Sequence, residues 1–437
     1  MQTSPERSEI RVDDAHDGDE ILRVGVKACA AVELSRRLET PIRAAARLAA
    51  GVALVIASSA CSRHHPSAAA APVAALREER AGRVECPMRL LRDVPFVQVR
   101  IGDGPPDWFV VDTGAPVSVF ASRLAARARH TSMDASVQVD KRPDAGALAL
   151  YSFDGVRFGE ATLNGVTGII SDRPDLDEAT GLRLGGIIGF SAFTDYLLTL
   201  DYPSRRVVLE RGALPDVDQR DVLYLTTHDL HPAIATRIGG RPRLTEIDSG
   251  SGFFLQLPTT DDTLPFAEPP VVVSHIETID GRSVARSGRV RAKMTIGTHV
   301  IEDPTVMTTD DPPMGYDIAR IGGPLLGHFV VTFDASNGRV RFSTGERAIT
   351  APPLRTLGLE FVRRDGAWLL RDFVAPNAGP VLGLAVGDRV VSVDDRPASA
   401  LDANDLSAAP YERNARFVFA RGAERLAVTV PVTVIVR

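Results

Sequence analysis

Residues 108–114 read Trp-Phe-Val-Val-Asp-Thr-Gly, and residues 244–250 read Leu-Thr-Glu-Ile-Asp-Ser-Gly. In each stretch a strand-prone run leads into an aspartate, which a hydroxyl residue and a glycine follow. Such a run places a carboxylate on a tight turn at the end of a strand. If the two turns face each other, Asp112 and Asp248 can share one proton and activate a water molecule.

The surroundings of the two triplets are also repeated. A single Asp-Thr/Ser-Gly triplet is expected roughly 0.2 times in a chain of this length, and alone it would indicate only a β-turn. An apolar-apolar-glycine segment follows Asp112 by 77 residues and Asp248 by 79. Landmarks that recur in the same order predict two similar halves. They are Arg-Ile-Gly (100–102 and 237–239), the apolar-apolar-glycine segment (187–189 and 325–327), and Arg-Val (206–207 and 339–340).

With these motifs, residues 85–345 resemble the pepsin-like and retropepsin-like aspartic proteases. The resemblance implies a mainly β fold in which two β-barrel lobes, related by a pseudo-twofold axis, each supply one catalytic aspartate. The catalytic residues would be Asp112 and Asp248. The residues implied to support them are Thr113 and Ser249, whose hydroxyls would bond across the axis, and Gly114 and Gly250, which would let backbone amides reach the carboxylates.

The roles within this pair stay open at this point. Two carboxyls that share a proton titrate as a unit, so the sequence does not say which aspartate is the acid and which the base. Tyr151, 39 residues after Asp112, is the candidate for the tyrosine that pepsin-like members carry on a flap. A partly buried strand tyrosine is the alternative, and Tyr151 is therefore not counted among the catalytic residues.

Composition excludes several classes of protein. The formal net charge of −6 over 437 residues gives no basic field for nucleic acid. Three cysteines (Cys29, Cys61 and Cys86) cannot form a disulfide framework, and neither Cys-x-x-Cys nor a metal-type histidine spacing occurs. We therefore expect no metal and no cofactor.

The segment from residue 42 to 61 predicts export. Arg43 and Arg47 precede the uncharged run 48–60, which ends in small residues before Cys61 and is too short for a comfortable membrane span. Cys61 resembles the lipidated cysteine of a bacterial lipoprotein, although Ser58 stands where leucine is usual. The prediction is a location in the bacterial periplasm or outer envelope, with membrane contact only through a lipid anchor. Cleavage near Ala60 and an uncleaved anchor are the alternatives.

Composition also divides the chain. Residues 1–41 form a charged extension that is predicted to be disordered, and a true start further in, for example at a valine codon, is one hypothesis. After the export segment, residues 62–84 read as a tether rich in Ala, Pro and Ser. The predicted lobes span 85–211 and 222–347, and a separate tail spans 356–437. Short strand-like segments between turn residues predict few, short helices, of which 122–130 is the clearest.

The tail has its own signature. Leu357-Gly358-Leu359, Asn-Ala-Gly-Pro at 377–380 and Gly-Asp-Arg-Val-Val-Ser-Val at 387–393 resemble a bacterial PDZ domain. The resemblance implies that Leu357, Gly358 and Leu359 capture an extended peptide by its C-terminus. The usual apolar segment of the groove is displaced to 382–385. The alternative is a β-rich appendage that only packs on the protease-like unit.

Two functions follow from these motifs. The first is an aspartic endopeptidase that acts on proteins or peptides in the bacterial envelope. The second is an inactive, protease-like scaffold that works through the PDZ-like tail, as the additional glycine in Asp-Ser-Gly-Ser-Gly at 248–252 suggests. Pairing of lobes between two chains is unnecessary because one chain carries both triplets.

Overall fold

A computed structural model describes residues 60–61, 82–137, 148–228, 230–258, 264–278, 281–309, 318–346, 348–374, 382–408 and 410–437. Strands make up 55% of the structure and helices 8%, which confirms the predicted mainly β class. Within the described residues no helix has the length and apolarity needed to cross a membrane. The predicted export segment lies outside them apart from the backbone of Ala60–Cys61, as do most of the tether and residues 377–380.

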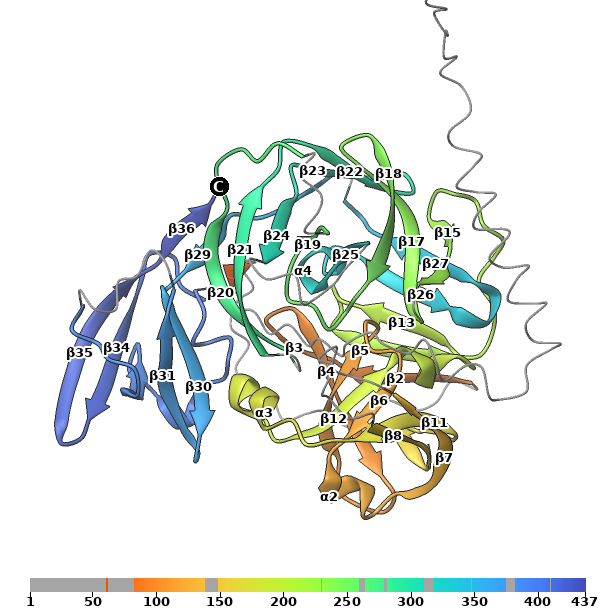
Figure 1. Cartoon of the computed structure of the whole chain (residues 1–437), viewed down its shortest axis with the longest axis horizontal. Helices are drawn as coiled ribbons and strands as arrows, with labels where there is room; N and C mark the ends of the chain where they lie inside the picture. Colours follow the sequence, from red (N-terminus) through yellow and green to blue (C-terminus); the bar gives the residue numbers. More distant parts are fainter. Residues whose placement is uncertain are drawn as a thin grey trace, which may run out of the picture. The chain divides into compact units, whose positions relative to one another are not determined.

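The first lobe is one curled sheet (Figure 1). Its strand order is β10-β9-β4-β5-β12-β6-β11-β8-β7, with β3 paired to β4. The central strands β5 and β12 run parallel, and β12 is buried along its whole length, as expected of an apolar run covered on both faces. The strands are β3 (Arg89–Leu91), β4 (Val94–Ile101), β5 (Asp107–Asp112), β6 (Ser118–Phe120), β7 (Arg129–Val137), β8 (Leu148–Asp154), β9 (Val156–Phe158), β10 (Ala161–Leu163), β11 (Val166–Ile170) and β12 (Leu184–Gly189).

The second lobe repeats this sheet strand for strand and adds one further strand at its edge. Its order, read from the other end, is β28-β23-β22-β17-β18-β25-β19-β24-β21-β20, with β16 paired to β17. Here β18 corresponds to β5, and β25 corresponds to β12. The strands are β16 (Thr226–His228), β17 (His231–Ile238), β18 (Arg241–Ile247), β19 (Leu255–Gln256), β20 (Val271–Thr278), β21 (Gly281–Arg289), β22 (Lys293–Ile296), β23 (His299–Glu302), β24 (Thr305–Thr309), β25 (Ala319–Ile321) and β28 (Ile349–Thr350).

A third sheet joins the lobes. Its order β15-β27-β26-β13-β14-β2 is symmetric about the antiparallel pair β13 and β26. At the middle of that pair Thr199 faces Thr332, with their hydroxyls 2.9 Å apart, so the pseudo-twofold axis passes through these two residues. The strands are β2 (Arg83–Pro87), β13 (Leu197–Asp201), β14 (Arg206–Glu210), β15 (Val222–Tyr224), β26 (Val330–Asp334) and β27 (Arg339–Ser343).

The described helices are short, as predicted. The helix expected over 122–130, however, is even shorter than predicted. It ends after one turn, as α2 (Ser122–Ala125), and Arg129 already begins β7, because residues 129–137 pair with β8. The other helices among the described residues are α3 (Pro174–Thr180), η2 (Phe190–Phe193), α4 (Gly323–Leu326), η4 (Ala335–Asn337) and η6 (Ala398–Ala400). In the two lobes η2 and α4 occupy corresponding places, directly after β12 and β25.

The tail forms a sheet of its own with a separate apolar core around Trp368, Phe417 and Phe419. Its order is β30-β31-β32-β34-β35, with β33 paired to β32. A small sheet of β1 (Ala60–Cys61), β29 (Leu354–Thr356) and β36 (Thr433–Val436) adjoins it. The tail strands are β30 (Leu359–Arg364), β31 (Ala367–Phe373), β32 (Arg389–Val393), β33 (Arg396–Pro397), β34 (Asn414–Arg421) and β35 (Glu424–Pro431).

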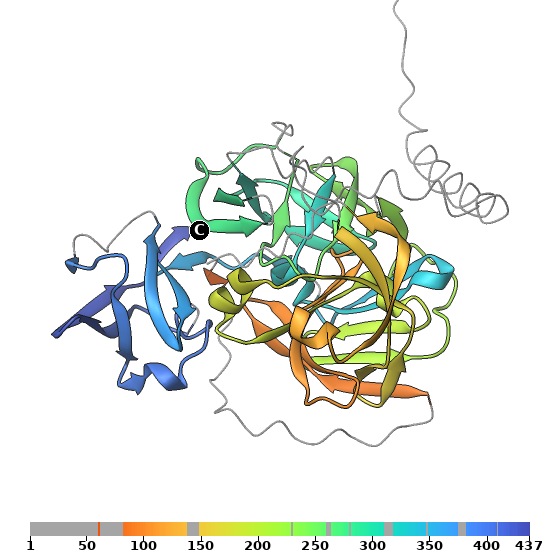
Figure 2. The same cartoon turned by 60° about the horizontal axis from the view of Figure 1, so that its bottom comes forward.

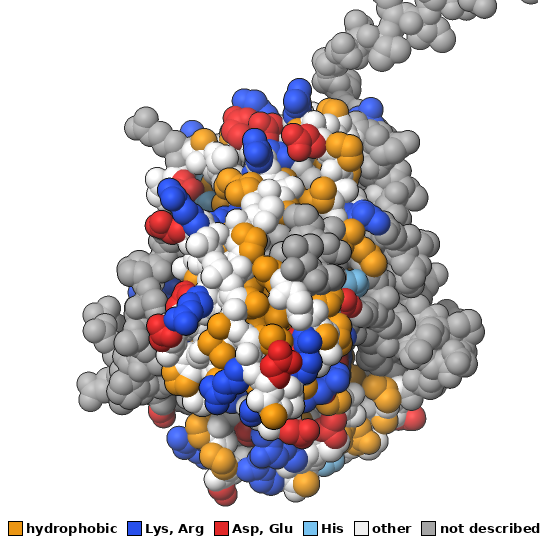
Figure 3. Space-filling view, turned by 90° about the vertical axis from the view of Figure 1, so that its left-hand side faces the viewer, with side chains coloured by type: hydrophobic (Ala, Val, Ile, Leu, Met, Phe, Trp, Pro, Cys, Tyr) orange, Lys and Arg blue, Asp and Glu red, His pale blue; other side chains and the backbone are white. Residues whose placement is uncertain are grey.

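The tail contacts both lobes. On the first lobe, Arg364 Nη2 lies 2.9 Å from Glu178 Oε2 of α3, which lies beside β30 (Figures 1 and 2). On the second lobe, Glu360 Oε1 accepts the backbone N–H of His275 in β20 at 2.7 Å. On the opposite, outward side of the tail, basic, acidic and apolar side chains among the described residues are interspersed (Figure 3).

Candidate active site

The fold brings the two Asp-Thr/Ser-Gly triplets together. Asp112 is the last residue of β5, and Asp248 directly follows β18, the corresponding strand. Each aspartate carbonyl accepts the N–H of the residue three further on, Ala115 or Ser251, at 3.3 Å. The two aspartates are only 2% and 1% exposed. Both carboxyls are therefore held on equivalent turns inside the molecule.

Reciprocal hydrogen bonds lock the two turns to each other. The Thr113 hydroxyl donates to the Ile247 carbonyl at 2.6 Å and accepts the Ser249 N–H at 2.9 Å. The Ser249 hydroxyl donates to the Val111 carbonyl at 2.7 Å and accepts the Thr113 N–H at 2.9 Å. All four bonds are buried and cross from one lobe to the other, so neither turn can shift without its partner.

The two glycines of the triplets leave room for the opposite carboxyl. A Cβ on Gly114 would lie 2.4 Å from Asp248 Cγ, and a Cβ on Gly250 would lie 2.5 Å from Asp112 Cγ. Their N–H groups donate to the carboxyl of their own triplet, at 2.9 Å to Asp112 Oδ1 and 2.8 Å to Asp248 Oδ1. Only glycine permits this approach because any side chain would overlap a carboxyl.

Burial and mutual proximity perturb both acids. Burial raises the pKa of Asp112 well above its usual range, and the charge of Asp248 and a hydrogen bond to it raise that pKa further. Burial also raises the pKa of Asp248, while the nearby positive charge of Arg320 lowers it. Two carboxyls this close hold one proton between them over a broad pH range. Such a pair can accept a proton and donate one in the same step.

One predicted landmark of the second lobe is wrong. The segment that packs behind the Asp248 turn is Arg320-Ile321-Gly322, and not Leu325-Leu326-Gly327, which lies in and just after α4. Gly189 pairs with Asp112, and a Cβ on it would meet the Ala115 carbonyl oxygen at 2.7 Å. A Cβ on Gly322 would meet the corresponding Ser251 oxygen at 2.6 Å. The two glycines are thus equivalent, and the apolar-apolar-glycine pattern has an arginine at its first position.

The arginine introduces a charged group that the sequence analysis missed. Arg320 Nη2 donates to Glu246 Oε2 at 2.9 Å, and Nη1 lies 3.2 Å from Asp248 Oδ2. The side chains of Arg320 and Glu246 are 3% and 4% exposed. The available signal was Glu246 itself, because it is a carboxylate two residues before Asp248 where the first lobe has Val110. Residues two apart in a strand share a face, so Glu246 is directed to the same side as Asp248.

Comparison with known protein families supports this geometry in the first lobe. Residues 97–192 match a family model described as aspartyl protease. The matched range runs from β4 to η2 and contains the Asp112 triplet together with Ile187-Ile188-Gly189. No curated protein matches the chain. The first lobe is therefore similar to aspartyl proteases, and the second lobe repeats its topology outside the matched range.

Tyr151 lies in the hairpin of β7 and β8, and its ring is half-buried. Its ring centroid is 5.2 Å from that of His130 and 6.2 Å from that of Phe153. The residue thus belongs to an aromatic cluster on that hairpin. Its use as a flap residue stays a prediction.

The residues predicted to bind peptide lie at the start of the tail sheet. Leu357 and Leu359 are buried in the tail core, at 3% and 4% exposure. Gly358 has a φ of +71°, its N–H donates to the Thr356 hydroxyl at 2.9 Å, and its carbonyl accepts the Val374 N–H at 3.0 Å. Both backbone groups of Gly358 are thus engaged within the tail. The PDZ resemblance has no support from the comparisons.

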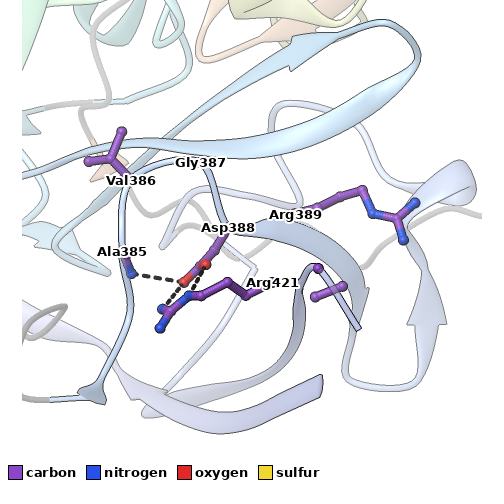
Figure 4. A pocket seen from close by; sticks show the side chains of 8 residues that line it. Ala385, Val386, Gly387, Asp388, Arg389 and Arg421 are labelled. Carbon is purple, nitrogen blue, oxygen red and sulfur yellow. Dashed lines mark hydrogen bonds and ion pairs between the residues drawn. The ribbon is translucent and has the colours of Figure 1, made fainter. Parts of the chain in front are cut away.

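A surface hollow of the tail is a structural junction (Figure 4). Asp388 stands at its centre, where its Oδ2 accepts the Ala385 N–H at 2.8 Å and lies 2.6 Å from Arg421 Nη2. The Arg421 hydrogen bond lowers the pKa of Asp388. These bonds tie the turn before β32 to the end of β34.

Among the described residues, one group has the spacing of metal ligands: His275, Glu360 and Asp372, whose ligand atoms lie within 4.8 Å of one another. His275 Nδ1 lies 3.0 Å from Glu360 Oε2, and the same carboxyl accepts the His275 N–H. These bonds join β20 of the second lobe to β30 of the tail. The group therefore holds the hairpin of β20 and β21 against the tail.

Proposed function

We propose that the protein is an aspartic endopeptidase that hydrolyses peptide bonds with a water molecule activated between Asp112 and Asp248. The observation that carries the proposal is the pair of buried carboxyls on turns locked by the Thr113 and Ser249 hydroxyls. The match of residues 97–192 to aspartyl proteases supports the same class of enzyme.

The chemistry needs only the pair and a bound water. The ionised carboxyl accepts a proton from water as its oxygen attacks the peptide carbonyl carbon, and the protonated carboxyl donates to the carbonyl oxygen. The resulting tetrahedral intermediate then releases the amine after the nitrogen is protonated. Because one carboxyl must be protonated and the other ionised, the rate should show a bell-shaped dependence on pH.

The test is cleavage of an unfolded, labelled protein by the full chain over a range of pH. Asp112→Asn and Asp248→Asn should each lower kcat/KM by about a hundredfold to ten-thousandfold, the usual contribution of acid–base groups. Asp395→Asn is the matched control, because Asp395 is 87% exposed and its positive φ of 63° is tolerated by asparagine. Equal cleavage by wild type and both dyad variants would contradict the proposal.

The alternative of an inactive scaffold rests on the tail. Binding of C-terminal peptides by the full chain, with no turnover and with loss of binding on Gly358→Val, would support it. Both backbone groups of Gly358 are hydrogen-bonded within the tail, so the structure gives no specific support to this alternative.

A bacterial envelope location also stays a proposal. It rests on residues 42–61, in which basic residues precede an apolar run that ends in small residues directly before Cys61. Intact mass and N-terminal sequencing of the protein from a bacterial host would distinguish lipidation at Cys61, cleavage near Ala60 and an intact N-terminus.

A further inference from the structure

The two lobes place different residues beside their aspartates. In the first lobe Val110 of β5 pairs with Ile187 of β12, and both are fully buried. In the second lobe the same two positions hold Glu246 of β18 and Arg320 of β25. Ile187 and Arg320 each stand two residues before the glycine that packs behind the aspartate turn. The two pairs therefore lie at the same level of their sheets. The second lobe thus has an ion pair where the first has two aliphatic side chains.

The guanidinium of Arg320 bridges two carboxylates. Its Nε and Nη2 donate to Glu246 Oε2 at 3.2 and 2.9 Å, and its Nη1 lies 3.2 Å from Asp248 Oδ2. All three side chains are less than 5% exposed, so water screens these charges little. At the corresponding place beside Asp112 stands Ile187, which offers no charge.

We propose that Arg320 is a positioning residue that keeps Asp248 ionised and thereby leaves the shared proton of the pair on Asp112. The inference rests on the proposed peptidase function and deepens it, because it assigns the two roles that sequence symmetry leaves open. Asp248 retains capacity for water, since a carboxylate accepts about four hydrogen bonds and here the Gly250 N–H and the Asp112 carboxyl use two, while Arg320 Nη1 makes an ionic contact at 3.2 Å.

The assignment orders the proton transfers. Asp248 removes a proton from water as the water oxygen bonds to the carbonyl carbon, and Asp112 gives its proton to the carbonyl oxygen. The intermediate then carries two hydroxyls, Asp248 is protonated and Asp112 is ionised. When the C–N bond breaks, Asp248 protonates the leaving nitrogen and Asp112 recovers a proton from one of the hydroxyls. The pair returns to its starting state.

Other charged and titratable groups around the pair do not reverse the assignment. Arg320 lowers the pKa of Asp248 more than the negative charge of Glu246 raises it, although burial raises that pKa overall. For Asp112 burial, the charge of Asp248 and the hydrogen bond between them all raise the pKa, and Arg320 lowers it less. The groups facing the pair are His231 on β17, Glu246 on β18, Arg320 on β25 and Tyr202 after β13, and Asp93 before β4 acts in turn on Tyr202.

Two variants should shift the pKa of Asp248 in opposite directions. Glu246→Gln keeps the arginine but removes the competing charge, so the pKa of Asp248 should fall. The double variant Glu246→Val/Arg320→Ile copies the aliphatic pair of the first lobe, so the pKa of Asp248 should rise. Ile187→Val is the matched control, because it alters packing at the mirrored position without changing charge.

The experiment is a pH titration of the full chain labelled with 13C at the aspartate side-chain carboxyl, followed by NMR. Asp112→Asn and Asp248→Asn identify the two signals. In wild type the Asp248 signal should titrate about 1 to 3 pH units below the Asp112 signal, the usual effect of an adjacent cation. Glu246→Gln should lower the Asp248 midpoint, the double variant should raise it by roughly one pH unit, and Ile187→Val should leave it in place.

The inference is overturned if Asp112 loses its proton first, if the two signals titrate together in wild type, or if Glu246→Gln does not lower the Asp248 midpoint. Glu246→Gln alone decides the matter if the double variant does not fold. A wild type that titrates as expected but cleaves nothing would contradict the peptidase proposal and leave this inference standing. A wild type that cleaves with the opposite order of titration would contradict only the inference.

Discussion

The two lobes share one topology, yet they differ in the chemistry beside the aspartates. Strand for strand, the first-lobe sheet corresponds to the second-lobe sheet, and the axis between them passes through Thr199 and Thr332. The aliphatic pair Val110–Ile187 in one lobe nevertheless corresponds to an ion pair in the other. A symmetric scaffold can therefore place two carboxyls equally, while one buried pair makes their charges unequal.

The ion pair is not needed for the fold, because the first lobe forms the same sheet without it. Desolvation of a buried ion pair offsets much of its attraction, whereas removing one partner leaves an uncompensated buried charge. The difference between the lobes is thus expected to affect function more than the stability of the intact protein.

Removing the arginine alone should have the largest effect on stability. Arg320→Met leaves Glu246 and Asp248 buried without their cation and should lower the free energy of unfolding by about 3–5 kcal/mol. The double variant Glu246→Val/Arg320→Ile should be much closer to wild type. Urea unfolding at pH 7 measures both, and a double variant as unstable as Arg320→Met would show that the lobes are not interchangeable at this position.

The locking hydroxyls should be equally important in the two lobes. Thr113→Val and Ser249→Ala each leave a buried carbonyl and a buried N–H without their partners, so each should lower the free energy of unfolding by about 1–3 kcal/mol. The measurement is urea unfolding of both variants side by side. A large effect in one lobe only would argue against a shared, symmetric lock. Ser136→Ala, on the exposed part of β7, is a suitable control.

The raised pKa of Asp112 should make stability depend on pH. Between an ordinary carboxyl pKa of about 3.9 and the raised native value, the folded protein holds a proton that the unfolded chain has lost. The free energy of unfolding should therefore fall as pH rises through that window, by up to about 1.4 kcal/mol per pH unit. Asp112→Asn removes this contribution, so its stability relative to wild type should increase with pH. A difference that is constant with pH would contradict the raised pKa.

The smallest effect is expected at the axis, where the lobes are chemically alike. Thr199→Val or Thr332→Val removes one hydroxyl of the pair and should lower the free energy of unfolding by about 1 kcal/mol, while the double variant should lose little more than either single one. A double-mutant cycle in urea gives the coupling. Purely additive losses would mean that the two hydroxyls do not interact.

The sequence predicted much of the site because its residues are close to each other along the chain. Asp112, Thr113 and Gly114 act through their own turn, and the copy at 248–250 repeats the pattern, so local spacing was sufficient. The helix over 122–130 was wrong because residues from 129 onward gain strand hydrogen bonds to β8, which no local pattern displays. The Leu325-Leu326-Gly327 landmark was wrong because residues 320–327 contain two neighbouring segments that end in glycine, and apolarity favoured the one in and just after α4.

By itself the sequence determined the duplicated triplets, the mainly β character and the choice of Asp112 and Asp248 as the candidate pair, since strand patterns and tight turns are properties of neighbouring residues. Only the tertiary structure decided that Glu246 and Arg320 meet beside Asp248, because their contact joins residues 74 positions apart across a parallel strand pair. Burial then gives the contact its importance, because the same charges in water would be screened.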